Sequence, residues 1–441
     1  MADFSLPRGV QYLVGETVEI KESVVSIIKE GFSNFGFQSF KSPALYNQDS
    51  LSFKSGDAIL KEIYAFEIKG HKLGLKFDQT VPLAIYLAMN PNQKLPFKRM
   101  EFGPAWRWGD VKEGRYREFE QFDIDIVGIV NMSADAEILS VASKTISKLG
   151  LKNHVINLNN RKLLDNIIEY SGALENYSTD YMHKEIQKNV IQSLDKLDKI
   201  GLESVKSELL AKDIEQNSID RLIEVINIKG KTNDSKLKNL ESILGESKGL
   251  VEINELLDYV KAHRISNKIN FNPSVARGLD YYTGPVFETI ITGQESLGSV
   301  CSGGRYDDMI GQYIGNSNDI PATGISIGVS RIIQAIKNEN VGSSFSRKKV
   351  YVANIGENLY FEATNIANKL RSKNIFTEIN LKPELKLSKQ LDLANKLGYK
   401  TVVIIGKREL ENNSVEIKNF SEKDPNKKQI TAKISELHKF L

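Results

Sequence analysis

The sequence has one cysteine, Cys301, and five histidines among its 441 residues. A single cysteine excludes an internal disulfide, and the scattered histidines match no metal-ligand spacing, so we expect no protein-bound metal site. Cys301 itself is expected to be a small buried thiol. No apolar run approaches the roughly 20 residues of a membrane helix, and the N-terminal segment lacks the basic and apolar regions of a signal peptide. These absences favour a cytoplasmic protein that does not enter a membrane.

The length of the chain and its charge distribution indicate more than one domain. A chain of 441 residues is too long for one ordinary core, so two or three domains are expected, with room for an enzyme. Residues 347–441 hold 19 Lys and Arg against 11 Asp and Glu, a balance of +8. Because the whole chain carries +3, the first 346 residues carry −5. The basic C-terminal part suits an anionic partner such as RNA, although a solvated lysine-rich surface explains the charge equally well.

The apolar pattern predicts a mixed, α+β protein built on an antiparallel sheet. A helix is expected from about residue 14, with its end marked by Gly36, and then a strand that ends near Pro43. Residues 63–127 contain short strands that pair as two antiparallel hairpins. Residues 160–262 are helical in pattern and are expected to be an insertion into this sheet.

Strand patterns return after the insertion and lead into a different C-terminal segment. A first domain, large enough to be catalytic, is expected over residues 1–337, and a linker is expected over residues 338–349. Residues 350–441 alternate strand and helix, which predicts a small α/β domain with a mixed, largely parallel sheet.

The stretch FKRMEFGPAWRWGDVKEGRYREFEQFDIDIVG carries the densest chemistry. Strand alternation places one set of its residues on a single face of the sheet: Phe119, Gln121, Asp123 and Asp125. Two acids and an amide beside apolar neighbours, with clustered arginines nearby, favour a site for a polyanion and an amine. The alternative is the solvent-facing side of an ordinary antiparallel sheet.

Four further stretches are weaker candidates. Asp78 and Thr80 stand at a strand end before a helix, where an N-cap is the better explanation of either residue alone. Gly278 and Gly284 bound a turn that holds Arg277, Asp280, Tyr281 and Tyr282, which makes a ligand wall plausible beside simple packing. The glycines of SGGRYDDM resemble a phosphate cradle without matching a known loop, and the arginine of GISIGVSR, at position 331, would ordinarily be structural.

Taken together, these segments resemble the class II aminoacyl-tRNA synthetases, and specifically the histidyl-tRNA synthetase family. GRYREF resembles the motif 2 loop and strand, GISIGVSR resembles motif 3, and ARGLDYYTG with GGRYD resembles the histidine-specific signatures. Residues 347–441 resemble the anticodon-binding domain of a subgroup of the class. The resemblance implies a class II antiparallel sheet flanked by helices, a helical insertion, and an α/β anticodon-binding domain at the C-terminus.

The resemblance also implies the reaction and its residues. Histidine would be activated with ATP and transferred to tRNA(His), with Mg²⁺ accompanying ATP and a homodimer as the working form. Asp78, Thr80 and Gln121 would bind the α-amino group of histidine, while Asp125 and Tyr282 read the imidazole and Tyr281 lines the pocket. Three arginines would be catalytic, namely Arg107, Arg277 and Arg331, with Arg107 and Arg277 also close to histidine. ATP would be held by Arg107, Arg115 and Arg331.

Some positions depart from the family pattern. Gln79 stands where Leu is usual and Ile85 where Arg is usual, and the acid expected at Gly109 is displaced to the next residue. Lys112 occupies the position that reads the extra 5′ guanosine of the tRNA in many bacterial members. Two alternatives remain at this stage: a non-catalytic paralogue that senses histidine as a regulatory subunit, and an RNA-binding module whose catalytic half is only a scaffold.

Overall fold

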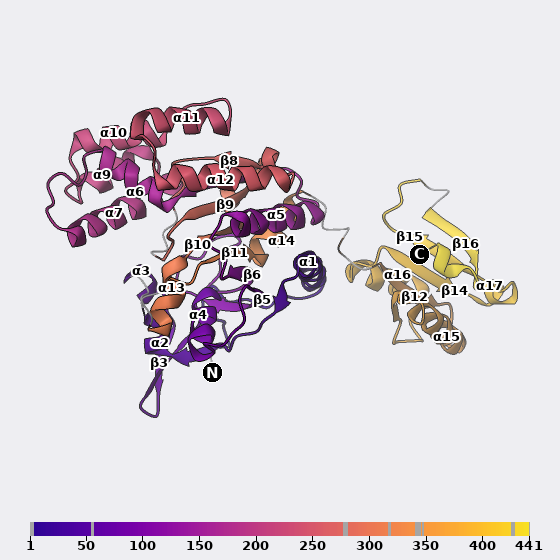
Figure 1. Ribbon diagram of the computed structural model, residues 1–441. Coiled ribbons are helices and arrows are strands. Elements are labelled where there is room, and N and C mark those ends of the chain that lie inside the picture. Colours follow the sequence, from indigo (N-terminus) through magenta and orange to yellow (C-terminus); the bar gives the residue numbers. More distant parts are fainter. Residues whose placement is uncertain are drawn as a thin grey trace. The chain divides into compact units, whose positions relative to one another are not determined.

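A computed structural model gives the fold of the chain (Figure 1). It describes residues 4–53, 57–276, 281–315, 319–339, 345, 348–424 and 428–440. The chain divides into two compact units, Met1–Ser344 and Phe345–Leu441. Among the described residues, no helix is both long and apolar enough to cross a membrane.

An eight-stranded sheet forms the centre of the first unit, in the order β1-β5-β6-β11-β10-β9-β7-β8. Its strands are β1 (Gln38–Ser39), β5 (Phe97–Trp106), β6 (Glu118–Val127), β7 (His154–Asn160), β8 (Ile269–Phe271), β9 (Pro285–Ile291), β10 (Cys301–Arg305) and β11 (Ala322–Gly328). The pairings β1–β5 and β7–β8 are parallel, and the others are antiparallel. The predicted antiparallel platform is therefore confirmed.

Strand β6 shows why the two faces of this sheet differ. Phe122, Ile124 and Ile126 are buried on one face, where the Phe122 ring meets the Phe32 ring edge-on at 5.0 Å. This face is covered by α1 (Glu16–Ser33), α5 (Ser133–Lys148) and α14 (Val329–Asn338). Because side chains alternate along a strand, the intervening residues of β6 point to the opposite face, where the chemistry lies.

A three-stranded sheet and several helices flank one edge of the platform. The strands are β2 (Leu45–Asn47), β3 (Ala65–Ile68) and β4 (His71–Leu75), and the helices are α2 (Gln48–Ser52), α3 (Asp57–Leu60), α4 (Thr80–Met89) and α13 (Asp307–Ile314). The β3–β4 hairpin, which turns between Ile68 and His71, confirms the first of the two hairpins predicted over residues 63–127. The strand expected to end near Pro43 is β1, which is only two residues long, and the chain then bends at Ala44 and enters β2 of the three-stranded sheet. Between the two strands, the backbone N–H and the hydroxyl of Ser42 both donate to the buried carboxylate of Glu101.

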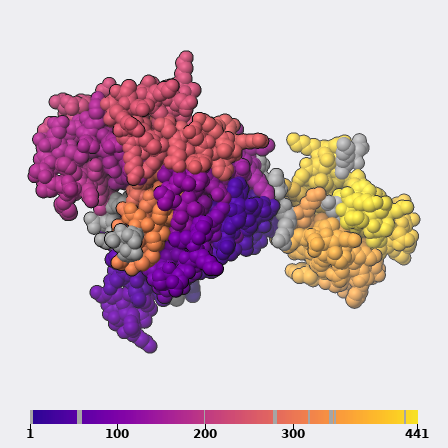
Figure 2. All heavy atoms as spheres, viewed as in Figure 1, coloured from indigo at the N-terminus to yellow at the C-terminus, as the bar shows by residue number. Residues whose placement is uncertain are grey.

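The predicted helical insertion follows β7 directly. It comprises α6 (Arg161–Tyr170), α7 (Asp180–Leu194), α8 (Leu197–Ile200), α9 (Leu202–Leu210), α10 (Gln216–Ile226), α11 (Asn233–Leu244) and α12 (Lys248–Ala262). Asn160, Thr179, Thr232 and Ser247 each accept a backbone N–H bond at the start of a helix, as N-caps do. Helices α6 and α12 pack on β7, and the insertion forms the purple-to-red mass at one side of the first unit (Figure 2).

The second unit is a five-stranded sheet in the order β13-β12-β14-β15-β16. Its elements are β12 (Lys349–Asn354), α15 (Tyr360–Arg371), β13 (Phe376–Ile379), α16 (Leu387–Lys396), β14 (Thr401–Ile405), α17 (Lys407–Glu411), β15 (Ser414–Asn419) and β16 (Gln429–Lys433). The sheet is mixed as predicted but not largely parallel, since β14–β15 and β15–β16 pair antiparallel. After α17 the chain forms the β15–β16 hairpin. The alternation of polar and apolar residues in these two strands resembles that of a strand that follows a crossover helix.

Candidate active site

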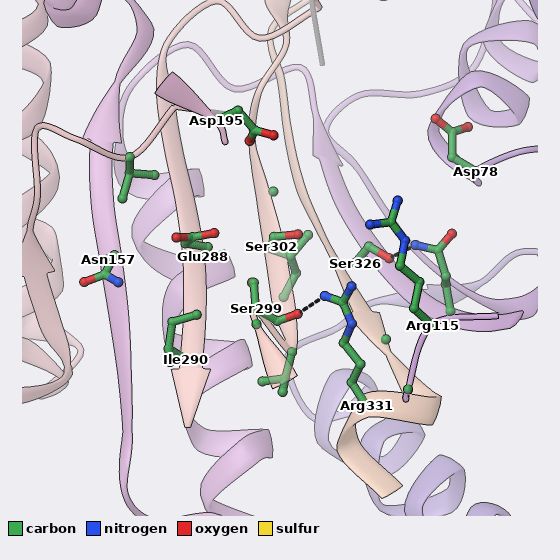
Figure 3. A pocket seen from close by; sticks show the side chains of 18 of the residues that line it. Asp78, Arg115, Asn157, Asp195, Glu288, Ile290, Ser299, Ser302, Ser326 and Arg331 are labelled. Atoms are coloured by element: carbon green, nitrogen blue, oxygen red, sulfur yellow. Dashed lines mark hydrogen bonds between the residues drawn. The ribbon is translucent and has the colours of Figure 1, made fainter. Parts of the chain in front are cut away.

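A cavity of about 1120 Å³ opens over the polar face of the platform. Its floor comes from β6, β11, β10, β9 and β7, and Figure 3 shows Ser302 between Glu288 and Ser326 on neighbouring strands. Gln121, Asp123 and Asp125 all line it, so the face predicted from strand alternation is the floor of the site. A hollow of this size accommodates two small substrates side by side.

Residues far apart in the sequence close the sides of this cavity. Asp78 and Thr80 enter from the start of α4, Arg107 and Arg115 from the β5–β6 connection, and Arg331 from α14. The helical insertion contributes Leu194, Asp195, Leu197 and Lys199. The cavity therefore brings together most of the residues singled out in the sequence. Arg277, Gly278 and Asp280 lie outside the described residues.

Asp125 is held from two sides at the cavity floor. The hydroxyl of Tyr306 donates to Oδ1, and Nη2 of Arg99 lies 2.7 Å from Oδ2. Arg99 is fully buried and also pairs with Glu101 at 3.3 Å, which in turn pairs with Lys76 at 3.0 Å. Burial raises the pKa of the Asp125 carboxyl, and Arg99 partly offsets that rise. A cation on the next strand thus favours the ionised form of a carboxylate that lines the cavity.

Asp78 combines the two roles considered for it. Its Oδ1 accepts the backbone N–H of Val81 at 3.0 Å, which caps α4. Its Oδ2 is buried and has no hydrogen-bond partner among the described residues. Burial raises the pKa of Asp78, and the nearby Arg107 guanidinium lowers it again in part. One oxygen therefore serves the helix, while the other remains available to a donor in the cavity.

The arginines are oriented by backbone and ring contacts. Arg107 donates from Nε to the carbonyl of Phe77 at 2.8 Å, and its guanidinium lies 5.6 Å from the Phe119 ring. Arg331 donates to the carbonyl of Ser299, as Figure 3 shows. Gly114 in the β5–β6 connection lies against Arg331: a Cβ there would be 3.4 Å from its Cγ. Arg115 is exposed, in keeping with a loop position at the rim of the cavity.

The glycines of the cavity floor let neighbouring side chains approach the backbone closely, and they do not form a phosphate-binding loop. Gly303 and Gly304 lie within β10, where a Cβ on Gly304 would be 2.8 Å from the Tyr282 ring. A Cβ on Gly324 would be 2.1 Å from Oδ1 of Asp125. The phosphate-cradle interpretation of SGGRYDDM is therefore wrong, because the glycines are needed to seat neighbouring side chains. The rings of Tyr281 and Tyr282 lie beside this point, tilted by 58° with centroids 4.8 Å apart.

Sequence reasoning missed the residues that act behind the cavity surface. Arg99 and Tyr306, which hold Asp125, received no role, although Arg99 alternates with Glu101 on the same strand. Ser326 was also missed; it accepts a hydrogen bond from Nε2 of Gln121. In the sequence, such residues are indicated by a polar side chain at a strand position that faces the interior. This pattern can be interpreted only once the pairing of the strands is known. Among the described residues, no group of three or more His, Cys, Asp or Glu could hold a metal ion.

Comparison with known proteins decides which family carries this site. The family model "Histidyl-tRNA synthetase" matches residues 9–332 and the model "Anticodon binding domain" matches residues 349–441. The chain belongs to the histidyl-tRNA synthetase family. The family predicted from the sequence is therefore confirmed, and with it the class of reaction, ligation of histidine to tRNA.

Individual relatives of this histidyl-tRNA synthetase family member agree along the whole chain. A histidine–tRNA ligase of Clostridium tetani is 35% identical over 94% of this chain and 93% of its own length. Histidine–tRNA ligase 1 of Bacillus cereus is 34% identical over 98% of both chains. The crystal structure of histidyl-tRNA synthetase from Nostoc sp. PCC 7120 covers 100% of this chain and 99% of its own, with a TM-score of 0.80 and 28% identity. These ligases favour the enzyme over the regulatory paralogue.

Proposed function

We propose that the cavity binds histidine and ATP side by side, and that the chain joins them as histidyl-adenylate before transferring histidine to tRNA(His). One observation carries this assignment of the site: buried acids and several arginines line a single cavity. Acids suit the ammonium and ring N–H groups of histidine, and arginines suit phosphate. The acids of a solvent-facing sheet would not be buried in this way.

The histidine end is assigned to the acidic side. Asp78, Thr80 and Gln121 take the α-amino group, because Oδ2 of Asp78 and Oε1 of Gln121 are buried acceptors with no partner among the described residues. Asp125 and Tyr282 read the imidazole, and Tyr281 lines the pocket. Asp125 accepts a ring N–H in addition to its contacts with Tyr306 and Arg99, and an amino acid without that donor would lose this bond to a charged acceptor. This accounts for selection of histidine.

The ATP end is assigned to the arginines. Arg107 holds the α-phosphate, Arg331 the γ-phosphate end and Arg115 a further phosphate oxygen from the loop. Arg277 approaches the α-phosphate from the histidine side. Mg²⁺ bound to ATP phosphates usually needs only one or two protein carboxylates, and Glu288, which lines the cavity on β9, fits that need. The bound ion supplies charge neutralisation to the triphosphate.

The chemistry follows from positioning and charge. The histidine carboxylate attacks the α-phosphorus in line, and pyrophosphate leaves with the bonding electrons. No proton has to be transferred in this step, so a general base is not required. Arg107 and Arg277 neutralise the charge that develops on the α-phosphoryl oxygens, and Arg331 stabilises the leaving pyrophosphate.

The basic second unit is assigned to the anticodon of the tRNA, and the working form to a homodimer. The family model for anticodon binding spans nearly all of this unit, and its balance of +8 suits phosphate. Light scattering coupled to size exclusion measures the oligomeric state: a mass near 99 kDa is expected, twice the 49.5 kDa of one chain.

Charging of tRNA tests this function directly. Full-length protein is incubated with ATP, Mg²⁺, radiolabelled histidine and total tRNA, and acid-precipitable label is followed with time. We expect label to accumulate only when ATP and tRNA are both present. Asp125→Asn should reduce charging strongly, while Glu118→Gln, an exposed change on the same strand, should not. Absence of charging by the wild-type chain would reject the proposed function.

A further inference from the structure

Asp123 is a buried acid of the cavity floor that has no role in the assignments above. It lies on β6 between Gln121 and Asp125, its side chain is only 3% exposed, and it lines the cavity. Its Oδ1 has no hydrogen-bond partner among the described residues. An unsatisfied carboxylate oxygen in a buried site costs several kcal/mol unless a donor arrives. The floor therefore presents an acceptor that the empty protein does not use.

The two other acceptors on this side of the cavity are unsatisfied in the same way. Within the described part of the chain, neither Oε1 of Gln121 nor Oδ2 of Asp78 has a partner. Ser326, opposite Asp123 on β11, links two members of the set: its hydroxyl accepts from Nε2 of Gln121 and bonds to Asp123. Because the amide nitrogen of Gln121 is engaged, its carbonyl oxygen is the atom left for a ligand.

The charges of the side chains around these three acceptors indicate which kind of ligand group they would bind. Arg99 and Lys76 are the buried cations nearby, and both are already paired, Arg99 with Asp125 and Glu101, and Lys76 with Glu101. No ion pair to Asp123 is present among the described residues, so a charged carboxylate at this position would lack a cationic partner from the protein. An ammonium group carries one positive charge and three N–H donors with no acceptor.

We propose that Asp123 is a further histidine-binding residue, which accepts an N–H of the substrate α-ammonium group beside Asp78, Thr80 and Gln121. The inference rests on the proposed function, since it concerns the same substrate in the same cavity. Ser326 is a positioning residue, because its hydroxyl fixes Gln121 and Asp123 relative to each other. Asp125 keeps the separate task of reading the ring.

The titration of Asp123 agrees with this placement. Burial raises the pKa of the Asp123 carboxyl to about 8, while Arg99 and Ser326 lower it and Asp125 and Asp78 raise it. Glu101 also faces it, directly opposite on β5. An ammonium group beside the carboxylate favours the charged form, so histidine binding should release a proton near neutral pH.

The test compares histidine with two ligands that each lack one of its groups. Calorimetric titration of the full-length chain measures the Kd of histidine, of histidinol, which keeps the ammonium but lacks the carboxylate, and of 3-(imidazol-4-yl)propionate, which lacks the ammonium. Asp123→Asn should weaken the first two by about 10- to 100-fold, the scale of one hydrogen bond to a charged group. The third should change by less than about threefold. Equal weakening of all three, or of none, would overturn the proposal.

Controls keep this result interpretable. Glu118→Gln, an exposed change on β6, should leave all three affinities unchanged. Ser326→Ala should also weaken the binding of the two ammonium-bearing ligands selectively, but by a smaller factor. This variant provides a second test if Asp123→Asn does not fold. If the wild-type chain binds no histidine at all, the proposed function fails. If it binds histidine but neither variant loses affinity selectively for the two ammonium-bearing ligands, only the role of Asp123 fails.

Discussion

Arg99 on β5 stands directly opposite Asp125 on β6, and its Nη2 lies 2.7 Å from Oδ2 of that carboxylate, with both side chains almost completely buried. Breaking such a pair leaves a buried charge without its partner. Arg99→Met should therefore reduce the free energy of unfolding by about 3–5 kcal/mol in urea titrations. Arg99→Lys keeps a cation and should lose less. Equal stability of the Met variant and the wild type would show that the pair does not hold the platform.

The spacing of β11 against Asp125 gives a steric prediction. A Cβ on Gly324 would fall 2.1 Å from Oδ1 of Asp125, so Gly324→Ala must displace that side chain. The KM for histidine in pyrophosphate exchange should rise at least tenfold, an estimate on the scale of losing one charged hydrogen bond. Gly103→Ala is the matched control, because its Cβ would meet its nearest neighbour at an ordinary 3.6 Å. Similar KM values for the two variants would contradict this prediction.

The pH dependence of stability reports on Asp123. The pKa of its carboxyl is about 8 in the folded chain and about 3.8 when unfolded. Between these values the folded state binds more protons, so this group makes stability fall as pH rises from about 4 to 8. Asp123→Asn removes the contribution. Thermal melts at pH 5, 6.5 and 8 should show a shallower decline for the variant than for the wild type. Parallel curves would mean that Asp123 does not hold a proton in the empty site.

Arg331 should matter for ATP and not for histidine. Arg331→Ala should lower the rate of adenylate formation by about 10²-fold or more, the scale of losing one preorganised charge-stabilising donor. Its Kd for histidine, measured without ATP, should change little, because Arg331 lies on the arginine side of the cavity. A large loss of histidine affinity with normal adenylation would reverse the assignment of the two ends.

Removing the second unit should separate the two half-reactions. A chain ending at residue 344 keeps the whole described cavity lining, so it should retain histidine-dependent pyrophosphate exchange. Charging of tRNA should become weaker and less sensitive to salt, because the basic unit no longer neutralises phosphates. A folded truncation without exchange activity would contradict this division of work.

The sequence predicted the parts of this molecule that depend on local periodicity. The β3–β4 hairpin, the β5–β6 pair and the insertion were predictable because alternation and helical spacing act over a few residues. The polar face of β6 was found for the same reason. Arg99, Tyr306 and Ser326 were not assigned roles because their importance depends on which strands become neighbours. The pairing of strands depends on the whole sheet and not on local sequence. The same holds for the antiparallel pairing of β14, β15 and β16 in the second unit.

Amino-acid selectivity in pyrophosphate exchange tests the central claim most directly, since the claim is that buried acids select histidine while arginines hold ATP. Full-length protein is assayed with Mg²⁺, ATP, labelled pyrophosphate and each of the standard amino acids in turn. The account predicts rapid exchange with histidine and exchange at background level with the others. Equal exchange with a second amino acid, or none with histidine, would contradict it.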